Sequence, residues 1–291
     1  MASLWLALQA LLKRDDFIMA QVINEVFGEA KLRGIKQGDI YVGQVFIDME
    51  RSPQISANSV GELLELLKAE AARMTKAFVG FEGARKRFRD FMPDGFADKR
   101  YVAQEREYKL ARRATLKAAA PLSARPFTAQ QAGAAAKAFS INLLHSTEQI
   151  RSREALVSPS GPAILEALAT FAEAPDQAAL DGLARLLKPF EAARWTVITL
   201  APFFWRPERH MFLKPEVTCE FAAAVGHPFH LEYGADLDIG VYDSLLDLTA
   251  RTEREVEGLY PVDRVDVQGF IWVVGRYVAE DVGRSGKLES D

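Results

Sequence analysis

Residues 195–233 read WTVITLAPFFWRPERHMFLKPEVTCEFAAAVGHPFHLEY and hold two of the four tryptophans, three of the four histidines and the only cysteine of the chain. The first eleven residues of this stretch are apolar or aromatic on nearly every side. A segment without a polar face is normally buried. We therefore expect it to form the core of the C-terminal half, packed against a second apolar segment at residues 267–274.

Prolines and glycines within this stretch predict where its elements end. Pro202 restricts a helix across the first part, so the pattern favours a short strand or helix end, followed by a turn at residues 206–209. Pro215 suits the first position of a helix, and Glu216 complements the positive end of its dipole. That helix should stop at Gly226.

The composition is that of a globular protein, with 49% hydrophobic and 26% charged residues in a chain of 291. This length allows one large domain or two ordinary ones. One cysteine excludes an internal disulfide framework. The opening MASLWLALQALLKRDD has no preceding basic region and no small-residue cleavage site, and its apolar run is too short to span a bilayer. The sequence therefore predicts a cytoplasmic protein without a membrane segment.

The N-terminal part predicts helices and one clear strand. Residues from Leu4 to about Arg33 fit two amphipathic helices that meet near residues 14–16. Residues 39–47, rich in β-branched and aromatic side chains, are the best strand candidate. The polar segment 50–59 is the best linker. We predict an N-terminal helical and β segment at residues 1–57, a helical main domain at 58–282 and a disordered tail at 283–291.

The remaining chain shows mostly helical periodicity. A stripe of apolar residues predicts a helix from about residue 60 to 78. Thr128 and Gln131 have the spacing of a capping box that opens an alanine-rich helix. Further helices are expected at about residues 98–119, 163–174, 176–190 and 238–259. The predicted fold class is mainly α, a multi-helical domain with a small β element near the N-terminus.

The net charge of −4 conceals an asymmetry. Residues 84–125 hold twelve Lys or Arg and five acids, so they carry +7 and the rest of the chain −11. A basic block of this kind meets phosphates or an acidic protein surface, which can be the chain's own C-terminal third. Aromatic residues interleaved with the cations add the possibility of base stacking. The predicted nucleic-acid-binding residues are Arg85, Lys86, Arg87, Arg89, Arg112 and Arg113.

The sequence predicts no cofactor, and a divalent metal is the single alternative for which it offers candidate ligands. His227, His230 and Glu232 fall within six residues, and in an extended segment the last two point to the same side. His210 could join them from across the turn. Their spacing matches no established metal motif, so partly exposed turn histidines without a metal are the default interpretation.

Two further groups are catalytic candidates. Cys219, near the start of the predicted helix at Pro215, could be a nucleophile with His210 or His227 as base, although a small buried hydrophobe is the commoner role. The second group is a set of four acids, Asp236, Asp238, Asp243 and Asp247. Paired carboxylates can hold Mg²⁺, but a solvated acidic face is the simpler interpretation of this set. A similar cluster, Asp48 and Glu50 followed by Arg51, comes after the predicted strand.

Three segments, FEGARKRFRDFMPDGFADKRYVAQEREYK, WTVITLAPFFWRPERHMFLKPEVT and DVQGFIWVV, resemble a family of uncharacterised bacterial proteins over roughly residues 78–274. The resemblance implies no activity, cofactor or catalytic residue. Common nucleotide-binding, hydrolase and redox motifs, such as GxxxxGK[ST], GxSxG, HExxH and CxxC, are absent from the sequence. Two hypotheses follow: a non-enzymatic protein that binds nucleic acid or an acidic partner through residues 85–113, or a metal-dependent hydrolase around His210, His227, His230 and Glu232.

Overall fold

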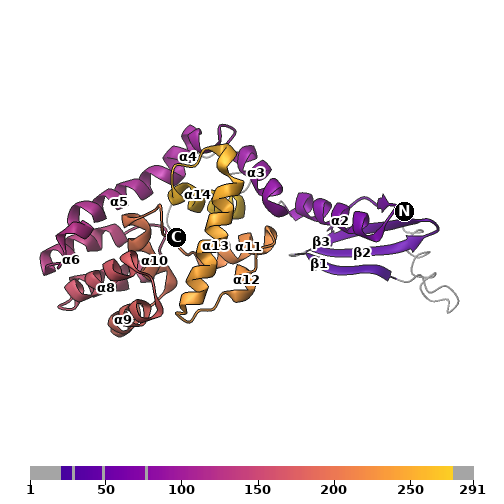
Figure 1. The fold of residues 1–291 in the computed structure, drawn as a ribbon. Helices are drawn as coiled ribbons and strands as arrows, with labels where there is room; N and C mark the ends of the chain where they lie inside the picture. The colour runs from indigo at the N-terminus through magenta and orange to yellow at the C-terminus, as the bar shows by residue number, and fades with distance from the viewer. Residues whose placement is uncertain (1–20, 28–29, 48–49, 76–77, 278–291) are drawn as a thin grey trace. The chain divides into compact units, whose positions relative to one another are not determined.

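The computed structural model describes residues 21–27, 30–47, 50–75 and 78–277. It confirms the predicted class, a mainly α protein with a small antiparallel sheet near the N-terminus (Figure 1). The chain forms two compact units, residues 1–79 and residues 80–291. The division falls later than the predicted boundary after residue 57, because the helix that begins at Val60 packs on the sheet. The predicted tail lies outside the described residues.

The first unit is an antiparallel sheet covered by one helix. Strands β1, β2 and β3 pair in sequence order, and the short strands β4 and β5 both pair with β3. The predicted strand at residues 39–47 is confirmed. The bounds are β1 Gln21–Phe27, β2 Ala30–Gln37, β3 Ile40–Ile47, β4 Glu50–Arg51, β5 Ile55–Ala57 and, for the helix, α2 Val60–Thr75.

The two helices predicted between Leu4 and Arg33 are wrong for every described residue of that range. Residues 4–20 lie outside the described part, but residues 21–27 and 30–33 belong to β1 and β2. The apolar residues of β1 fit a helical stripe and a strand equally well, so periodicity alone could not decide. Pairing along β2 decided the outcome, because it places Ile23, Leu32 and Val45 in one buried layer.

Two glycines let α2 lie close to the sheet (Figure 1). A Cβ on Gly43 would stand 2.7 Å from the carbonyl oxygen of Arg33 and 2.9 Å from the Leu67 side chain. A Cβ on Gly34 would meet Leu63 at 3.1 Å. Leu63 and Leu67 are fully buried in this core. The covered face is therefore fixed, and the opposite face of the sheet is the outer one.

The second unit is helical throughout its described residues. Its elements, in chain order, are α3 Gly80–Phe91, η1 Gly95–Ala97, α4 Lys99–Tyr101, η2 Val102–Arg106, α5 Glu107–Ala119, η3 Leu122–Ala124, α6 Ala129–Ala135, η4 Ala136–Phe139, α7 Ser146–Val157, α8 Gly161–Glu173, α9 Gln177–Leu187, η5 Lys188–Phe190, α10 Trp195–Trp205, α11 Pro215–Ala224, α12 Phe229–Glu232, α13 Ile239–Glu255, η6 Glu257–Leu259 and α14 Arg264–Arg276. The predicted capping box of Thr128 and Gln131 is present at the start of α6. The predicted helix at Pro215 ends before Gly226, which has φ +70°.

Helix α10 is the buried element that its composition indicates. All eleven of its residues are buried, and Pro202 lies inside the helix. The predicted strand or helix end is therefore wrong: because the whole segment is enclosed, packing keeps it helical despite the missing amide hydrogen. Helix α10 packs chiefly against α8 and α5, whereas α14 packs against α11, α3 and α13. The two apolar segments thus form separate parts of the core.

Among the described residues, no single helix is long and apolar enough to cross a membrane, although α7 and α8, bent by 111° at their junction, pass the length and composition test as a pair.

His210 ties three helices together from the connection after α10. Its Nε2 lies 2.7 Å from the carbonyl oxygen of Ala172 on α8, so Nε2 carries the hydrogen and donates it. Its Nδ1 therefore accepts from the hydroxyl of Tyr242 on α13, at 2.8 Å. The side chain is buried, and burial lowers the pKa of His210 to about 4. The folded protein holds this imidazole neutral.

We expect His210 to make the helical unit acid-sensitive. Its folded pKa lies below the ordinary value, so the unfolded chain takes up a proton first as the pH falls from about 6.5 to about 4. Stability should fall across that window by about 3 kcal/mol. The measurement is urea unfolding as a function of pH. His210→Gln should be less stable at pH 7 but lose less stability on acidification, whereas His145→Asn, at an exposed histidine, should keep the wild-type slope. Equal slopes in all three proteins would contradict the assignment.

Candidate functional site

The predicted basic face is largely turned into the protein. Arg85 forms an ion pair with Glu255 of α13 at 2.6 Å and also donates to the Glu255 carbonyl. Arg87 donates to the carbonyl oxygens of Val274 and Tyr277, both at 2.7 Å. Because these carbonyls belong to the end of α14, the two arginines join α3 to the C-terminal helices.

Of the other four predicted nucleic-acid-binding residues, two contact groups of the same chain and two are exposed. Arg113 donates to the Phe204 carbonyl at 3.2 Å and pairs with Asp263 at 3.3 Å. Arg112 reaches the Lys137 carbonyl at 3.5 Å. Lys86 and Arg89 are exposed, and neither forms an ion pair within the described residues. They share the outer surface of α3 with exposed Glu82 and Asp90, so that surface has no excess of positive charge.

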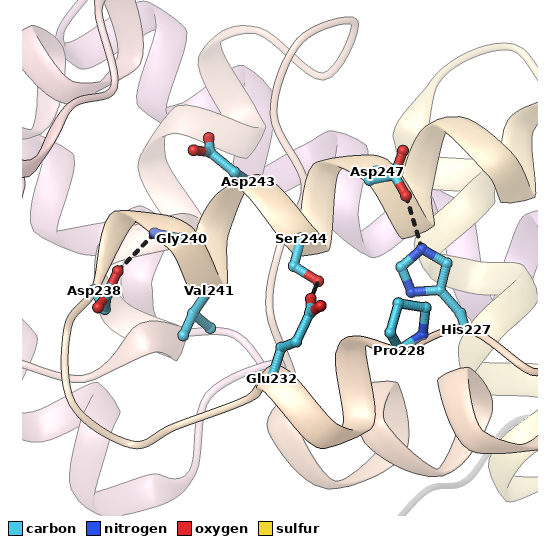
Figure 2. A pocket seen from close by; sticks show the side chains of 9 residues that line it. All are labelled: His227, Pro228, Glu232, Asp238, Gly240, Val241, Asp243, Ser244 and Asp247. Carbon is cyan, nitrogen blue, oxygen red and sulfur yellow. Dashed lines mark hydrogen bonds and ion pairs between the residues drawn. The ribbon is translucent and has the colours of Figure 1, made fainter.

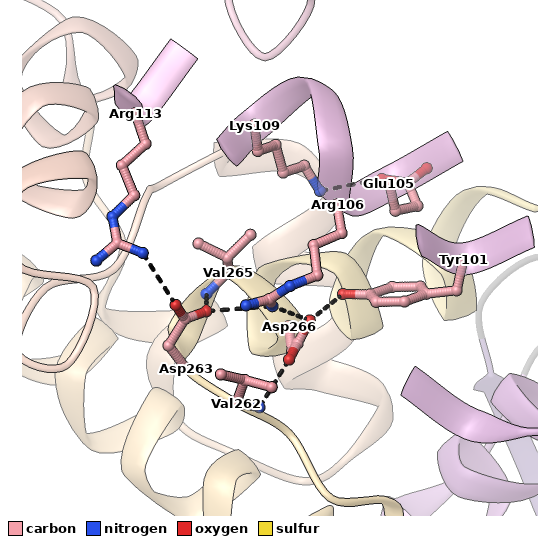
Figure 3. Close-up of polar contacts among 9 residues, drawn as sticks. All are labelled: Tyr101, Glu105, Arg106, Lys109, Arg113, Val262, Asp263, Val265 and Asp266. Atoms are coloured by element: carbon pink, nitrogen blue, oxygen red, sulfur yellow. Dashed lines mark hydrogen bonds and ion pairs between the residues drawn. The ribbon is translucent and has the colours of Figure 1, made fainter. Parts of the chain in front are cut away.

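Two further cations of the basic block, Arg106 and Lys109, enter a buried polar network (Figure 3). Lys109 and Glu105, 0% and 2% exposed, pair at 3.0 Å across a helical turn that begins in the π-helical segment η2. The hydroxyl of Tyr277 also donates to Glu105, at 2.8 Å. Burial lowers the pKa of Lys109, and the Glu105 carboxylate opposes that effect.

A second part of the network surrounds Asp266 of α14. Its carboxylate accepts from the Tyr101 hydroxyl at 2.8 Å, from Arg106 and from the backbone N–H of Val262 at 2.7 Å. Asp263 completes it by pairing with Arg106 at 3.3 Å. These groups satisfy one another, so the network is a structural joint between α14 and the segments α4 and η2, and it leaves little charge for a ligand.

The predicted metal ligands do not gather around one point. His210 is committed to Ala172 and Tyr242, as described above. His230 donates from Nδ1 to the His227 carbonyl at 2.7 Å. Glu232 accepts from Ser244. The described residues contain no group of three or more His, Cys, Asp or Glu side chains that could hold a metal ion. The short helix α12 replaces the extended segment that the hypothesis required.

Neither catalytic alternative receives support from the geometry. Cys219 is half-buried, and burial, followed by the charge of Glu220, raises the pKa of its thiol, which disfavours the nucleophilic thiolate. Asp48 lies outside the described residues. Of the four acids grouped with it in the metal hypothesis, Asp238, Asp243 and Asp247 line a common cleft.

That cleft lies between α12 and α13 (Figure 2). Its volume is about 620 Å³, and it is open to solvent. The nine lining residues include four carboxylates and no Lys or Arg; they are His227, Pro228, Glu232, Asp238, Gly240, Val241, Asp243, Ser244 and Asp247. We call this surface the acidic cleft.

Local contacts fix the walls of the acidic cleft. His227 ends the turn after α11, where its Nδ1 accepts from the N–H of Phe229 at 3.2 Å. Its Nε2 therefore carries the hydrogen and lies 2.9 Å from Asp247. Asp238 caps α13 by accepting from the N–H of Gly240 at 2.7 Å. Figure 2 shows the carboxyl groups spread along the cleft.

These contacts suit binding better than proton transfer. A histidine general base needs a bare nitrogen that faces the substrate. In His227 the bare nitrogen is already occupied by a backbone N–H. Ser244 donates to Glu232 and not to the imidazole, so no Ser-His-Asp arrangement is formed.

The sequence contains a signal for this cleft, a run of acids without any Lys or Arg. The 36 residues from Pro215 to Ala250 contain seven acids and no Lys or Arg. Glu216 and Glu220 pair with Arg276, at 3.0 and 2.6 Å. The other five acids lie between residues 232 and 247, and four of them line the cleft. The run of acids without cations, more than any single residue, marks the site.

Comparison with known proteins finds no matching family model, no matching curated protein and no matching solved structure.

The buried Glu105–Lys109 pair should show the energetics of an ion pair without water. Glu105→Gln or Lys109→Met leaves the partner charge buried and uncompensated, and each should cost about 3–5 kcal/mol in urea unfolding. The double variant removes both charges and should lose less than the sum of the two. Glu216→Gln, at a carboxylate 80% exposed, breaks the pair with Arg276 and should cost at most about 1 kcal/mol. Strict additivity of the two buried substitutions would refute the pairing.

Proposed function

We propose that this protein is a binding protein whose acidic cleft takes a positively charged segment of another protein. The observation that carries the proposal is the lining of the cleft, four carboxylates without a Lys or Arg. Walls of one charge sign focus the electrostatic field and raise the local concentration of oppositely charged ligands. Lysine or arginine side chains of an incoming segment supply the matching charges and can form charge-assisted hydrogen bonds.

The spread of the carboxylates favours an extended ligand over a metal ion. Asp243 and Asp247 stand one helical turn apart on α13, with Glu232 contributed by α12. Residues at this spacing have Cβ atoms about 5–6 Å apart, which suits separate cations on one ligand. A single ion requires ligands that converge, and no such group occurs among the described residues.

The nucleic-acid hypothesis for residues 85–113 is not carried into this proposal. Arg85, Arg87 and Arg113 already bind acids and carbonyl groups of the same chain. With these cations paired internally, Glu232 of α12 and Asp243 of α13 remain as acids that form no ion pair within the described residues. A cytoplasmic location, based on the single cysteine, remains part of the proposal.

Binding of a labelled arginine- and lysine-rich peptide tests the proposal by fluorescence anisotropy at low salt. Glu232→Gln combined with Asp243→Asn should weaken binding about fivefold to tenfold, because two exposed charges are lost. The matched control is Glu154→Gln with Glu257→Gln, which changes the net charge equally at exposed sites outside the cleft. That control should bind like the wild type.

Three outcomes would count against the proposal. Equal weakening in the cleft and control variants would show that net charge alone attracts the peptide. Competition by spermine as effective as that by the peptide would indicate a small polycation as ligand. Stoichiometric binding of Ca²⁺ or Mg²⁺ that displaces the peptide would restore the metal hypothesis.

A further inference from the structure

The outer face of the sheet in the first unit presents a second surface, of opposite charge. The strand register places Val26 of β1, Lys31 of β2, Phe46 of β3 and Arg51 of β4 in one row across the sheet. The neighbouring row holds Asn24, Arg33 and Gln44. We call these seven residues the outer sheet patch. They point away from α2, because Ala30, Leu32 and Val45 alternate with them toward the core.

The patch is cationic, and its seven residues include no acid. Lys31 and Arg51 are exposed and Arg33 is half-buried. Arg33 donates to the side chain of Asn24 and to the Leu32 carbonyl at 3.4 Å, and both of these acceptors are neutral. Among the described strand residues, no carboxylate belongs to either row, and none of the three cations forms an ion pair within the described part of the chain.

An aromatic ring lies between two of these cations. Phe46 stands directly across from Lys31 on one side and from Arg51 on the other. The ring is only partly buried, and Val26 at the end of the row is 70% exposed. Asn24 and Gln44 add amide groups, which can both donate and accept hydrogen bonds. Stacking surface, cations and amides thus share a single face.

We propose that the outer sheet patch binds single-stranded nucleic acid. Phosphates contact Lys31, Arg33 and Arg51, and a base stacks on Phe46. A sheet that combines a positive surface with a ring for stacking is a general means of holding unpaired bases. An acidic peptide matches the cations but gives the ring and the amides no role. The proposal concerns a different unit from the acidic cleft and does not depend on it.

The test uses the full chain and a fluorescein-labelled single-stranded oligonucleotide, with DNA and RNA versions, at several salt concentrations. Three phosphate contacts predict a slope of about −2 for the logarithm of the association constant against the logarithm of salt. Lys31→Gln, Arg33→Gln and Arg51→Gln together should weaken binding at least tenfold at low salt and flatten that slope. The matched control changes three exposed cations of the helical unit, Lys86→Gln, Arg89→Gln and Lys117→Gln, and should retain both affinity and slope.

The ring has its own readout. Phe46→Leu should weaken binding about tenfold while leaving the salt slope unchanged, and Phe46→Tyr should restore it, with circular dichroism confirming an intact fold in each variant. Four results would overturn the proposal: no binding at low salt, equal loss in the sheet and control triple variants, duplex binding as tight as single-strand binding, or equal competition by a polyglutamate peptide. The DNA and RNA arms then show whether the 2′-hydroxyl contributes.

Discussion

The helical unit depends on the exclusion of water from the contact between η2 and α14. Lys109 and Glu105 have lost their hydration, and Arg106 lies against Asp263 and Asp266 at the other end of the same contact. A buried charge is tolerated only when paired and hydrogen-bonded, so each group requires the others to be in position. The π-helical segment η2 contains Glu105 and so forms part of this joint. Arg113 and Arg87 extend it to the carbonyls at the ends of α10 and α14.

This joint determines which charges the surface can offer. A block that carries +7 in sequence satisfies acids and carbonyls of its own chain, so its formal charge overstates what an external anion would meet. Within the described residues, the acids between residues 232 and 247 form no ion pair with Lys or Arg, and Asp247 contacts His227. Helices α11, α12 and most of α13 contain neither Lys nor Arg. The charge counted along the sequence therefore overstates the exposed charge of residues 84–125, whereas the distribution of unpaired charge draws attention to the acidic cleft.

The sequence predicted those features that local chemistry determines. Thr128 with Gln131 and Pro215 with Gly226 specify helix ends through backbone hydrogen bonds and φ angles, and all four act as expected. Residues 39–47 are so rich in β-branched and aromatic side chains that their sequence favours a strand over a helix. In contrast, residues 21–33 are periodic as helix or strand, and only pairing with β3 resolves them. The prediction of a break at Pro202 was wrong for a related reason, since it also neglected tertiary packing: the complete burial of α10 outweighs the hydrogen bond that the proline cannot donate.

The candidate surfaces were harder to foresee, since each depends on which side chains share a face. Phe46 and Arg51 are neighbours only because β4 pairs with β3, and Lys31 joins them only through the register of β2. The acidic cleft likewise needs the turn at His227 to bring Glu232 toward α13. Each surface is nevertheless built from contacts within a single unit. The carboxylates of the acidic cleft and the cations of the outer sheet patch belong to different units, so each surface follows from the contacts inside its own unit.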